Sequence, residues 1–124
     1  MTIERLYKAY ADISFERYDE EAEKTETVKT EVVALVKGNK SRLFMELENG
    51  DYYWLTTEWH PQDAPTEMTE EYMRREIEAM IDYVKQVNTD ERLAEIYEMD
   101  YYDMDVDYMS REEISNYFLA EQLM

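Results

Sequence analysis

Residues 27–59 read TVKTEVVALVKGNKSRLFMELENGDYYWLTTEW, and this stretch decides the fold that the sequence predicts. Asn49-Gly50 separates two runs in which apolar and polar residues alternate. Asn-Gly is a strong signal for a two-residue hairpin turn, because both turn residues need a positive φ. Gly38-Asn39 is a second candidate turn. We therefore predict three antiparallel strands joined by two tight turns.

Two-residue turns fix the register of these strands, because pairing then follows by counting outward from each turn. The pairs expected to face each other are Val32 with Met45, Ala34 with Leu43, Met45 with Trp54, and Leu47 with Tyr52. One face then carries Val32, Ala34, Val36, Leu43, Met45, Leu47 and Trp54. The other face is half apolar and carries Val33, Leu35, Phe44 and Leu55 beside Glu31, Glu46 and Tyr53. The apolar face of such a sheet must be buried by other elements of the chain packed against it.

The composition is strongly acidic. Among 124 residues, 31 are Asp or Glu and 13 are Lys or Arg, which gives a formal charge of −18. A hydrophobic content of 44%, with 14% aromatic residues, argues against disorder, because disordered acidic segments contain few aromatic residues. A field of this sign repels nucleic acid and anionic membranes and attracts basic surfaces. The expected partner is a basic protein, with no direct binding to nucleic acid or membrane.

The remaining chain is predicted to be mainly helical. Thr2 is placed to cap a first helix, whose apolar face would carry Ile3, Leu6, Tyr7 and Tyr10. The stretch from Ile13 to Tyr18 either extends this helix or forms a short extended piece. Thr66 or Thr69 caps a second helix with a stripe of Met73, Ile77, Met80, Ile81, Val84 and Val87. Thr89 caps a third helix, whose inward side chains are Leu93, Ile96 and Tyr97. The spacing of Ser110 and Glu113 is that of a capping box and predicts a last helix, with Ile114, Tyr117, Phe118 and Leu123 on one face.

The predicted fold class is therefore α+β: an N-terminal helix, a three-stranded antiparallel meander, and two to three C-terminal helices packed on one face. One domain is expected over residues 1–124. Within it, residues 1–22 form a helix and acidic connector, 27–59 the sheet, and 66–124 the helical, strongly acidic part. The absence of cysteine and of an apolar signal sequence predicts a cytoplasmic protein.

No enzyme chemistry is predicted. Both glycines are used by the hairpin turns, which leaves no phosphate-cradling loop, and the single histidine, His60, has no cysteine partner. Asp103, Asp105 and Asp107 have the spacing of a calcium loop, but Tyr108 and Ile114 stand where that loop needs glycine and glutamate. We expect no catalytic residue, metal or cofactor.

The segment from Glu98 to Glu113 is the candidate site, with seven acidic residues and one basic residue, Arg111. In an extended chain alternate side chains lie ~6.6 Å apart, close to two phosphate steps of ~3.4 Å along a DNA strand. Asp103, Asp105 and Asp107 would then imitate phosphates. In the alternative interpretation the acids form a solvated loop and the neighbouring aromatic residues pack inward.

The composition and the predicted order of elements over roughly residues 1–100 resemble the type II anti-CRISPR proteins, small acidic phage proteins that block Cas9. In that family carboxylates replace PAM DNA against arginines that otherwise read guanine. By position, Glu98, Asp100, Asp103, Asp105 and Asp107 would do so here. The longer C-terminal segment has no clear counterpart in the family. The resemblance implies a location in the host bacterial cytoplasm.

We therefore predict a nucleic-acid-mimicking inhibitor of a host-defence nuclease, most of all one that blocks DNA binding by Cas9. An antirestriction protein or a DNA-glycosylase inhibitor is a related alternative. A different alternative is a cytosolic adaptor or assembly module that binds a protein through its tyrosines, Tyr52 and Tyr53 included. The predicted partner-binding residues are Glu98, Asp100, Asp103, Asp105, Asp107, Glu112, Glu113, Tyr101, Tyr102 and Tyr108.

Overall fold

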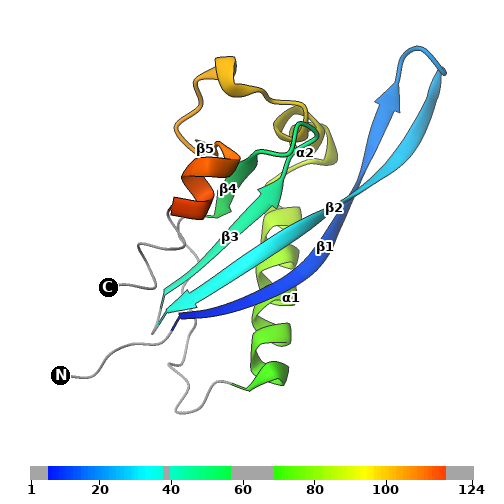
Figure 1. Cartoon of the computed structure of the whole chain (residues 1–124). Coiled ribbons are helices and arrows are strands. Elements are labelled where there is room, and N and C mark those ends of the chain that lie inside the picture. Colours follow the sequence, from blue (N-terminus) through cyan, green and yellow to red (C-terminus); the bar gives the residue numbers. More distant parts are fainter. Residues whose placement is uncertain (1–5, 38–39, 57–68, 117–124) are drawn as a thin grey trace.

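The computed structural model describes residues 6–37, 40–56 and 69–116. These residues form an antiparallel sheet with strand order β1-β2-β3-β4-β5 (Figure 1). The strands are β1 (Leu6–Asp19), β2 (Lys24–Lys37), β3 (Lys40–Glu46), β4 (Tyr52–Thr56) and β5 (Tyr108–Met109). The helices are α1 (Glu70–Val87), α2 (Asp90–Tyr97) and the 3-10 turn η1 (Tyr101–Asp103), followed by helical residues 111–116. The five-stranded sheet replaces the predicted three-stranded meander.

The predicted N-terminal helix is wrong, because Leu6–Asp19 is strand β1. This strand pairs with β2 along its whole length, from Leu6 opposite Lys37 to Asp19 opposite Lys24. The reason is a period of two: Ile13 and Phe15 are buried, and the residues between and beside them are exposed. Ala9 and Ala11 continue this inward row as partly buried contacts of the core. Thr2 and Ile3 lie outside the described residues.

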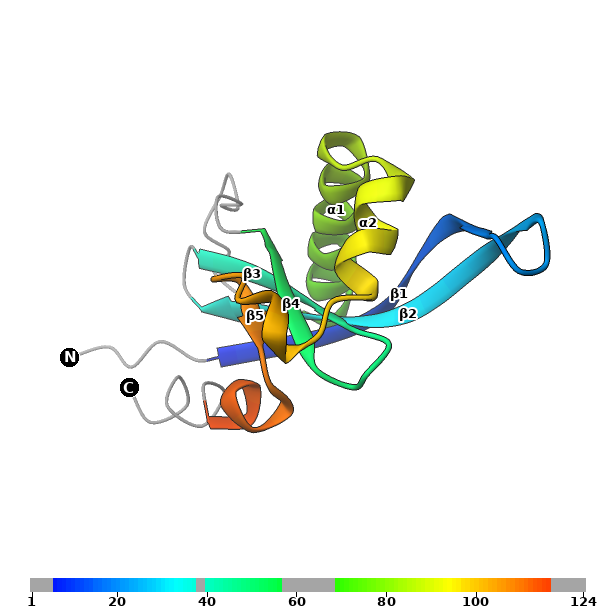
Figure 2. The ribbon, with the colours of Figure 1, turned by 90° about the horizontal axis from the view of Figure 1, so that it is seen from above.

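The predicted acidic connector is the tip of the β1–β2 hairpin. Oδ1 of Asp19 accepts hydrogen bonds from the backbone N–H groups of Glu21 (3.0 Å) and Ala22 (3.3 Å), a local turn typical of aspartate. Glu23 has a left-handed backbone with φ of 52°, which completes the reversal. The tip extends beyond the rest of the sheet, as Figures 1 and 2 both show.

The predicted register is confirmed between β2 and β3, where Val32 faces Met45 and Ala34 faces Leu43. Between β3 and β4 it is wrong by one residue, because Met45 faces Tyr53 and Phe44 faces Trp54. Residues 47–51 form the connection, and in the described chain only Gly50 of the Asn49-Gly50 pair has a positive φ, 91°. Gly38 and Asn39 lie outside the described residues.

The sheet is covered on both faces, not on one as predicted (Figure 2). Helices α1 and α2 pack on the main core, and residues 111–116 lie on the opposite face. The main core contains Ile13, Phe15, Val28, Val32, Ala34, Leu43, Met45, Leu47, Tyr53, Ile77, Met80, Val84, Leu93, Ala94 and Ile96. The second cluster contains Val33, Leu35, Phe44 and Ile114, with Tyr52, Trp54 and Met109 against it. The register shift thus exchanges the predicted faces of Tyr53 and Trp54.

Three predicted helix caps are present. Thr69 accepts a hydrogen bond from the N–H of Tyr72, Thr89 from that of Arg92, and Ser110 from that of Glu113. Most of the predicted stripe of α1 is buried, but Val87 is 59% exposed. Thr66, His60, Tyr117, Phe118 and Leu123 lie outside the described residues. No helix within the described ranges has the length and apolarity needed to cross a bilayer.

Candidate interaction surface

Residues 98–113, called the acidic segment below, lie along the β4 edge of the sheet. Strand β5 within this segment pairs with β4, with Tyr108 opposite Tyr53 and Met109 opposite Tyr52. The N–H of Trp54 also donates to the carbonyl of Asp107 at 3.0 Å. Backbone pairing of this kind gives the segment a defined position on the sheet.

The β3–β4 loop also holds the acidic segment in place, through hydrogen bonds of Asn49 and Asp51. Nδ2 of Asn49 donates to the hydroxyl of Tyr108 (2.8 Å) and to the carbonyl of Met99 (3.3 Å). The Tyr108 hydroxyl donates to Oδ2 of Asp51 in a very short hydrogen bond, and Oδ1 of Asp51 accepts from the N–H of Arg111 at 3.0 Å. Burial and this carboxylate raise the pKa of Tyr108 to about 12. Asn49 therefore stabilises long-range contacts in addition to the turn.

Asp100 and Asp103 cap the short helix η1. Oδ1 of Asp100 accepts from the N–H of Tyr102 at 2.9 Å, and Oδ2 of Asp103 accepts from the N–H of Asp100 at 2.7 Å. This reciprocal arrangement is a capping box. The two carboxylates thus bind backbone N–H groups of the same short segment.

Asp105 organises the following turn. Its carboxylate accepts from the hydroxyl of Tyr53, at 3.2 Å to each oxygen, and from the N–H of Asp107 at 2.9 Å. Burial, followed by the charges of Asp105 and Asp107, raises the pKa of Tyr53 to about 12. The pKa of Asp107 is also raised, by burial and then by the neighbouring charge of Asp105. A buried tyrosine therefore fixes one carboxylate at the surface.

The predicted extended array of phosphate-like carboxylates is wrong. Tyr101–Asp103 is a 3-10 turn, and Met104 has a left-handed backbone with φ of 53°. Asp103, Asp105 and Asp107 therefore do not alternate along one side of a strand, because the chain between them turns. The alternative with inward aromatic residues is also incomplete, since Tyr101 is 64% and Tyr102 86% exposed.

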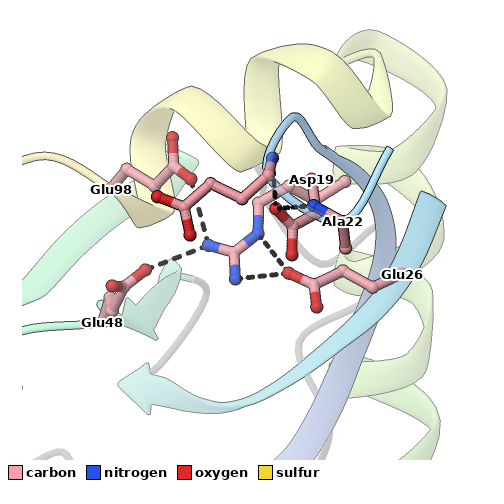
Figure 3. A network of polar contacts seen from close by, with 7 residues as sticks. Asp19, Ala22, Glu26, Glu48 and Glu98 are labelled. Atoms are coloured by element: carbon pink, nitrogen blue, oxygen red, sulfur yellow. Dashed lines mark hydrogen bonds and ion pairs between the residues drawn. The ribbon is translucent and has the colours of Figure 1, made fainter. Parts of the chain in front are cut away.

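Arg17 forms a separate cluster with three glutamates, which Figure 3 labels. Its guanidinium lies 2.7 Å from Glu26, 3.0 Å from Glu48 and 3.0 Å from Glu98. The group also stacks over the ring of Tyr97, 5.6 Å from the ring centroid. Hydrogen bonding to Glu26 raises the pKa of Arg17 above its usual value, although burial opposes this effect. The Arg17 cluster, defined as Arg17, Glu26, Glu48 and Glu98, joins the hairpin to α2 and the β3–β4 loop.

This cluster separates Glu98 from the other predicted site residues. In the described part of the chain, Glu98 is the one carboxylate of the acidic segment that lies in an ion pair with Arg or Lys. Asp100, Asp103 and Asp105 accept hydrogen bonds from neutral donors. Glu112 and Glu113 are exposed at the start of the last helical segment. Within the described chain, the carboxylates of residues 100–113 are therefore mostly held by neutral donors or exposed, without an ion pair to Arg or Lys.

The structure brings several of the predicted tyrosines together. Tyr101, Tyr102 and Tyr108 line one hollow with Met104, Asp105 and Glu113, whereas Glu112 does not line it. Sequence reasoning missed Asn49, Asp51 and Arg17, which position these groups from distant strands and loops. Met104 (88%) and Val106 (95%) are exposed, and the signal for this in the sequence is that each is a single apolar residue between two aspartates.

Within the described ranges, no group of three or more His, Cys, Asp or Glu side chains is arranged to hold a metal ion. Comparisons with protein-family models, with curated proteins and with solved structures found no match to this chain.

Proposed function

We propose that this protein inhibits a DNA-binding nuclease of host defence by presenting carboxylates to the surface that otherwise holds DNA. The observation that carries the proposal is the acidic segment, in which residues 100–113 are fixed against the sheet without an ion pair to Arg or Lys in the described chain. A carboxylate held in place loses little freedom on binding and forms strong, charge-assisted hydrogen bonds with arginine.

Cas9 is the first target to test, ahead of restriction enzymes and DNA glycosylases. The resemblance to type II anti-CRISPR proteins motivates this order, and after the correction of the N-terminal helix it rests on the acidic composition. The net charge of −18 supports any target with a basic DNA channel, because opposite potentials accelerate association. Inhibition would be competitive, and added salt would weaken it.

A capture experiment tests whether such a target exists. The immobilised protein is incubated with a bacterial lysate that contains Cas9 or other DNA-binding nucleases, at low and at high salt. We expect a basic nuclease to be retained at low salt and released at high salt. Retention of no basic DNA-binding protein at either salt concentration contradicts the proposal.

A competition experiment then tests the acidic segment. Asp103 and Asp105 are unsuitable for substitution, because their side chains hold the turn. The variant instead combines Asp107→Asn, Glu112→Gln and Glu113→Gln. The matched control removes the same charge from the hairpin tip with Glu20→Gln, Glu21→Gln and Glu23→Gln. We expect the first variant to displace DNA from the nuclease roughly tenfold less well than the control. Equal displacement by both variants rejects this surface.

The exposed apolar side chains favour a second candidate function, an adaptor that binds a protein partner or a second copy of itself. Tyr102, Met104 and Val106 are each at least 86% exposed and lie within five consecutive residues. Large exposed apolar side chains next to one another are typical of binding surfaces. Self-association that rises with protein concentration and does not change with salt would favour this function over inhibition of a nuclease.

A further inference from the structure

The acidic segment contains a hollow of about 340 Å³ that opens to the surface, called the tyrosine hollow below. It is lined by Tyr101, Tyr102, Met104, Asp105, Tyr108 and Glu113, none of which is basic. The ring of Tyr101 stands nearly perpendicular to both neighbouring rings: 5.9 Å and 85° from Tyr102, and 6.4 Å and 76° from Tyr108. Three rings at these angles provide aromatic walls with different orientations around one space.

The lining favours a positively charged ligand. The face of an aromatic ring attracts a cation, and in proteins this cation is more often an arginine guanidinium than a lysine ammonium. Two carboxylates, Asp105 and Glu113, add negative charge to the same lining. Asp105 accepts from the Tyr53 hydroxyl and from one backbone N–H, so its oxygens retain free lone pairs.

The protein already holds a cation in this way. Arg17 lies over the ring of Tyr97 while Glu26, Glu48 and Glu98 accept from its guanidinium. A second guanidinium, that of Arg42, lies 5.5 Å from the ring centroid of Trp54. The tyrosine hollow combines the same two components, rings and carboxylates, and its lining contains no arginine.

We propose that the tyrosine hollow binds the guanidinium group of an arginine side chain from a protein partner. Arginine fits better than lysine, because its planar group stacks on aromatic faces, binds carboxylates in a fixed geometry and is more weakly hydrated. This inference rests on the proposed function and deepens it, because it names the partner group that one part of the acidic segment recognises.

Two peptides of equal charge test the proposal: hexa-arginine and hexa-lysine, each titrated into the full chain by calorimetry at low salt. Attraction between opposite charges contributes to the binding of both peptides, whereas stacking on the rings favours arginine. We expect hexa-arginine to bind about twofold to fivefold more tightly than hexa-lysine, which is the range for a cation over an exposed ring.

Tyr102→Leu is the informative variant, because its 86% exposed ring can be removed with little effect on folding. The control is Tyr18→Leu, which removes a 61% exposed ring near the hairpin tip. We expect Tyr102→Leu to weaken hexa-arginine binding more than hexa-lysine binding and so to reduce the preference, and the control to retain it. Circular dichroism checks that both variants are folded.

Three outcomes overturn the proposal: equal affinity for the two peptides, a preference that Tyr102→Leu leaves unchanged, or no binding of either peptide. Failure of the proposed function is a separate result, because it appears in the capture experiment as the absence of a basic nuclease. A nuclease captured by a protein that does not distinguish the two peptides would retain the proposed function and reject the arginine site.

Discussion

Two groups of carboxylates in this protein differ in the groups that donate hydrogen bonds to them. In the Arg17 cluster, Glu26, Glu48 and Glu98 surround one guanidinium, so their charge is partly cancelled within the fold. In residues 100–113, carboxylates accept hydrogen bonds from backbone N–H groups and from the hydroxyl of Tyr53. A neutral donor satisfies the lone pairs of a carboxylate and leaves its charge in place.

The difference identifies which acids are available to a partner. A carboxylate paired with arginine has part of its charge compensated within the fold, whereas one held by neutral donors is positioned without a compensating cation. Composition alone does not distinguish the two groups, since both are rich in Asp and Glu. The following substitutions test this contrast, beginning with the largest expected effect.

Arg17→Met should cause the largest loss of stability, about 2 kcal/mol, because three glutamates would lose their common cation and repel one another. This figure allows for the partial exposure of the glutamates, whose side chains are 38–58% exposed. Chemical denaturation measures the change. Arg75→Met is the control, because Arg75 makes an exposed i,i+4 pair with Glu71 and its loss should cost under about 0.5 kcal/mol. Equal losses for the two variants would contradict the assigned role of Arg17.

Tyr53→Phe should cost about 1 kcal/mol, because it removes the hydroxyl that donates to Asp105 and keeps the packed ring. The same change should alter the conformation of residues 105–107, which amide hydrogen exchange can detect. Tyr10→Phe is the matched control at a ring that is 62% exposed. If Tyr53→Phe leaves both stability and exchange at the control level, the hydrogen bond does not hold this turn.

Alkaline pH should weaken the anchorage of the acidic segment. The pKa values of Tyr53 and Tyr108 are raised from 10.0 to about 12 in the fold. The folded state therefore holds these two protons more tightly than the unfolded state does. The resulting stabilisation is complete below pH 10 and is lost as the pH rises toward 12.

Ultraviolet titration of tyrosinate should reveal tyrosines that ionise above the usual pKa, and Tyr53→Phe and Tyr108→Phe should each remove one of them. Ionisation of all tyrosines near their usual pKa would contradict these contacts.

Glu112→Gln should have the smallest effect. Glu112 is exposed and lies in no ion pair with Arg or Lys in the described chain, so removal of its charge should change stability by less than about 0.5 kcal/mol. Glu98→Gln is the informative counterpart, because it weakens an ion pair with Arg17 and should lower stability. Denaturation curves measured side by side compare the two changes, and equal losses of stability would erase the distinction between the two groups.

Local signals in the sequence predicted part of the fold correctly. The caps at Thr69, Thr89 and Ser110 and the register of β2 with β3 all depend on residues close to one another in the chain or on a single turn. Strand β1 was missed because its inward row begins with alanines, which are weakly apolar, while the tyrosines beside them fit a helical period equally well.

The errors at the candidate site came from long-range contacts. Asn49 was expected to serve a two-residue turn, but its side chain donates to Tyr108 and Met99, and the loop is correspondingly longer. The pairing of Glu98 with Arg17 spans 81 residues, and no local pattern announces it. Sequence therefore located the acidic segment, whereas tertiary contacts determined which of its charges remain available.

The most direct test of this account is an NMR titration of the full chain with hexa-arginine, with amide chemical shifts followed residue by residue. We expect the largest shift changes in residues 100–113 and small ones at Glu26, Glu48 and Glu98, and higher salt should reduce both. The largest changes at the Arg17 cluster, with residues 100–113 unaffected, would contradict the claim that the acidic segment carries the available charge.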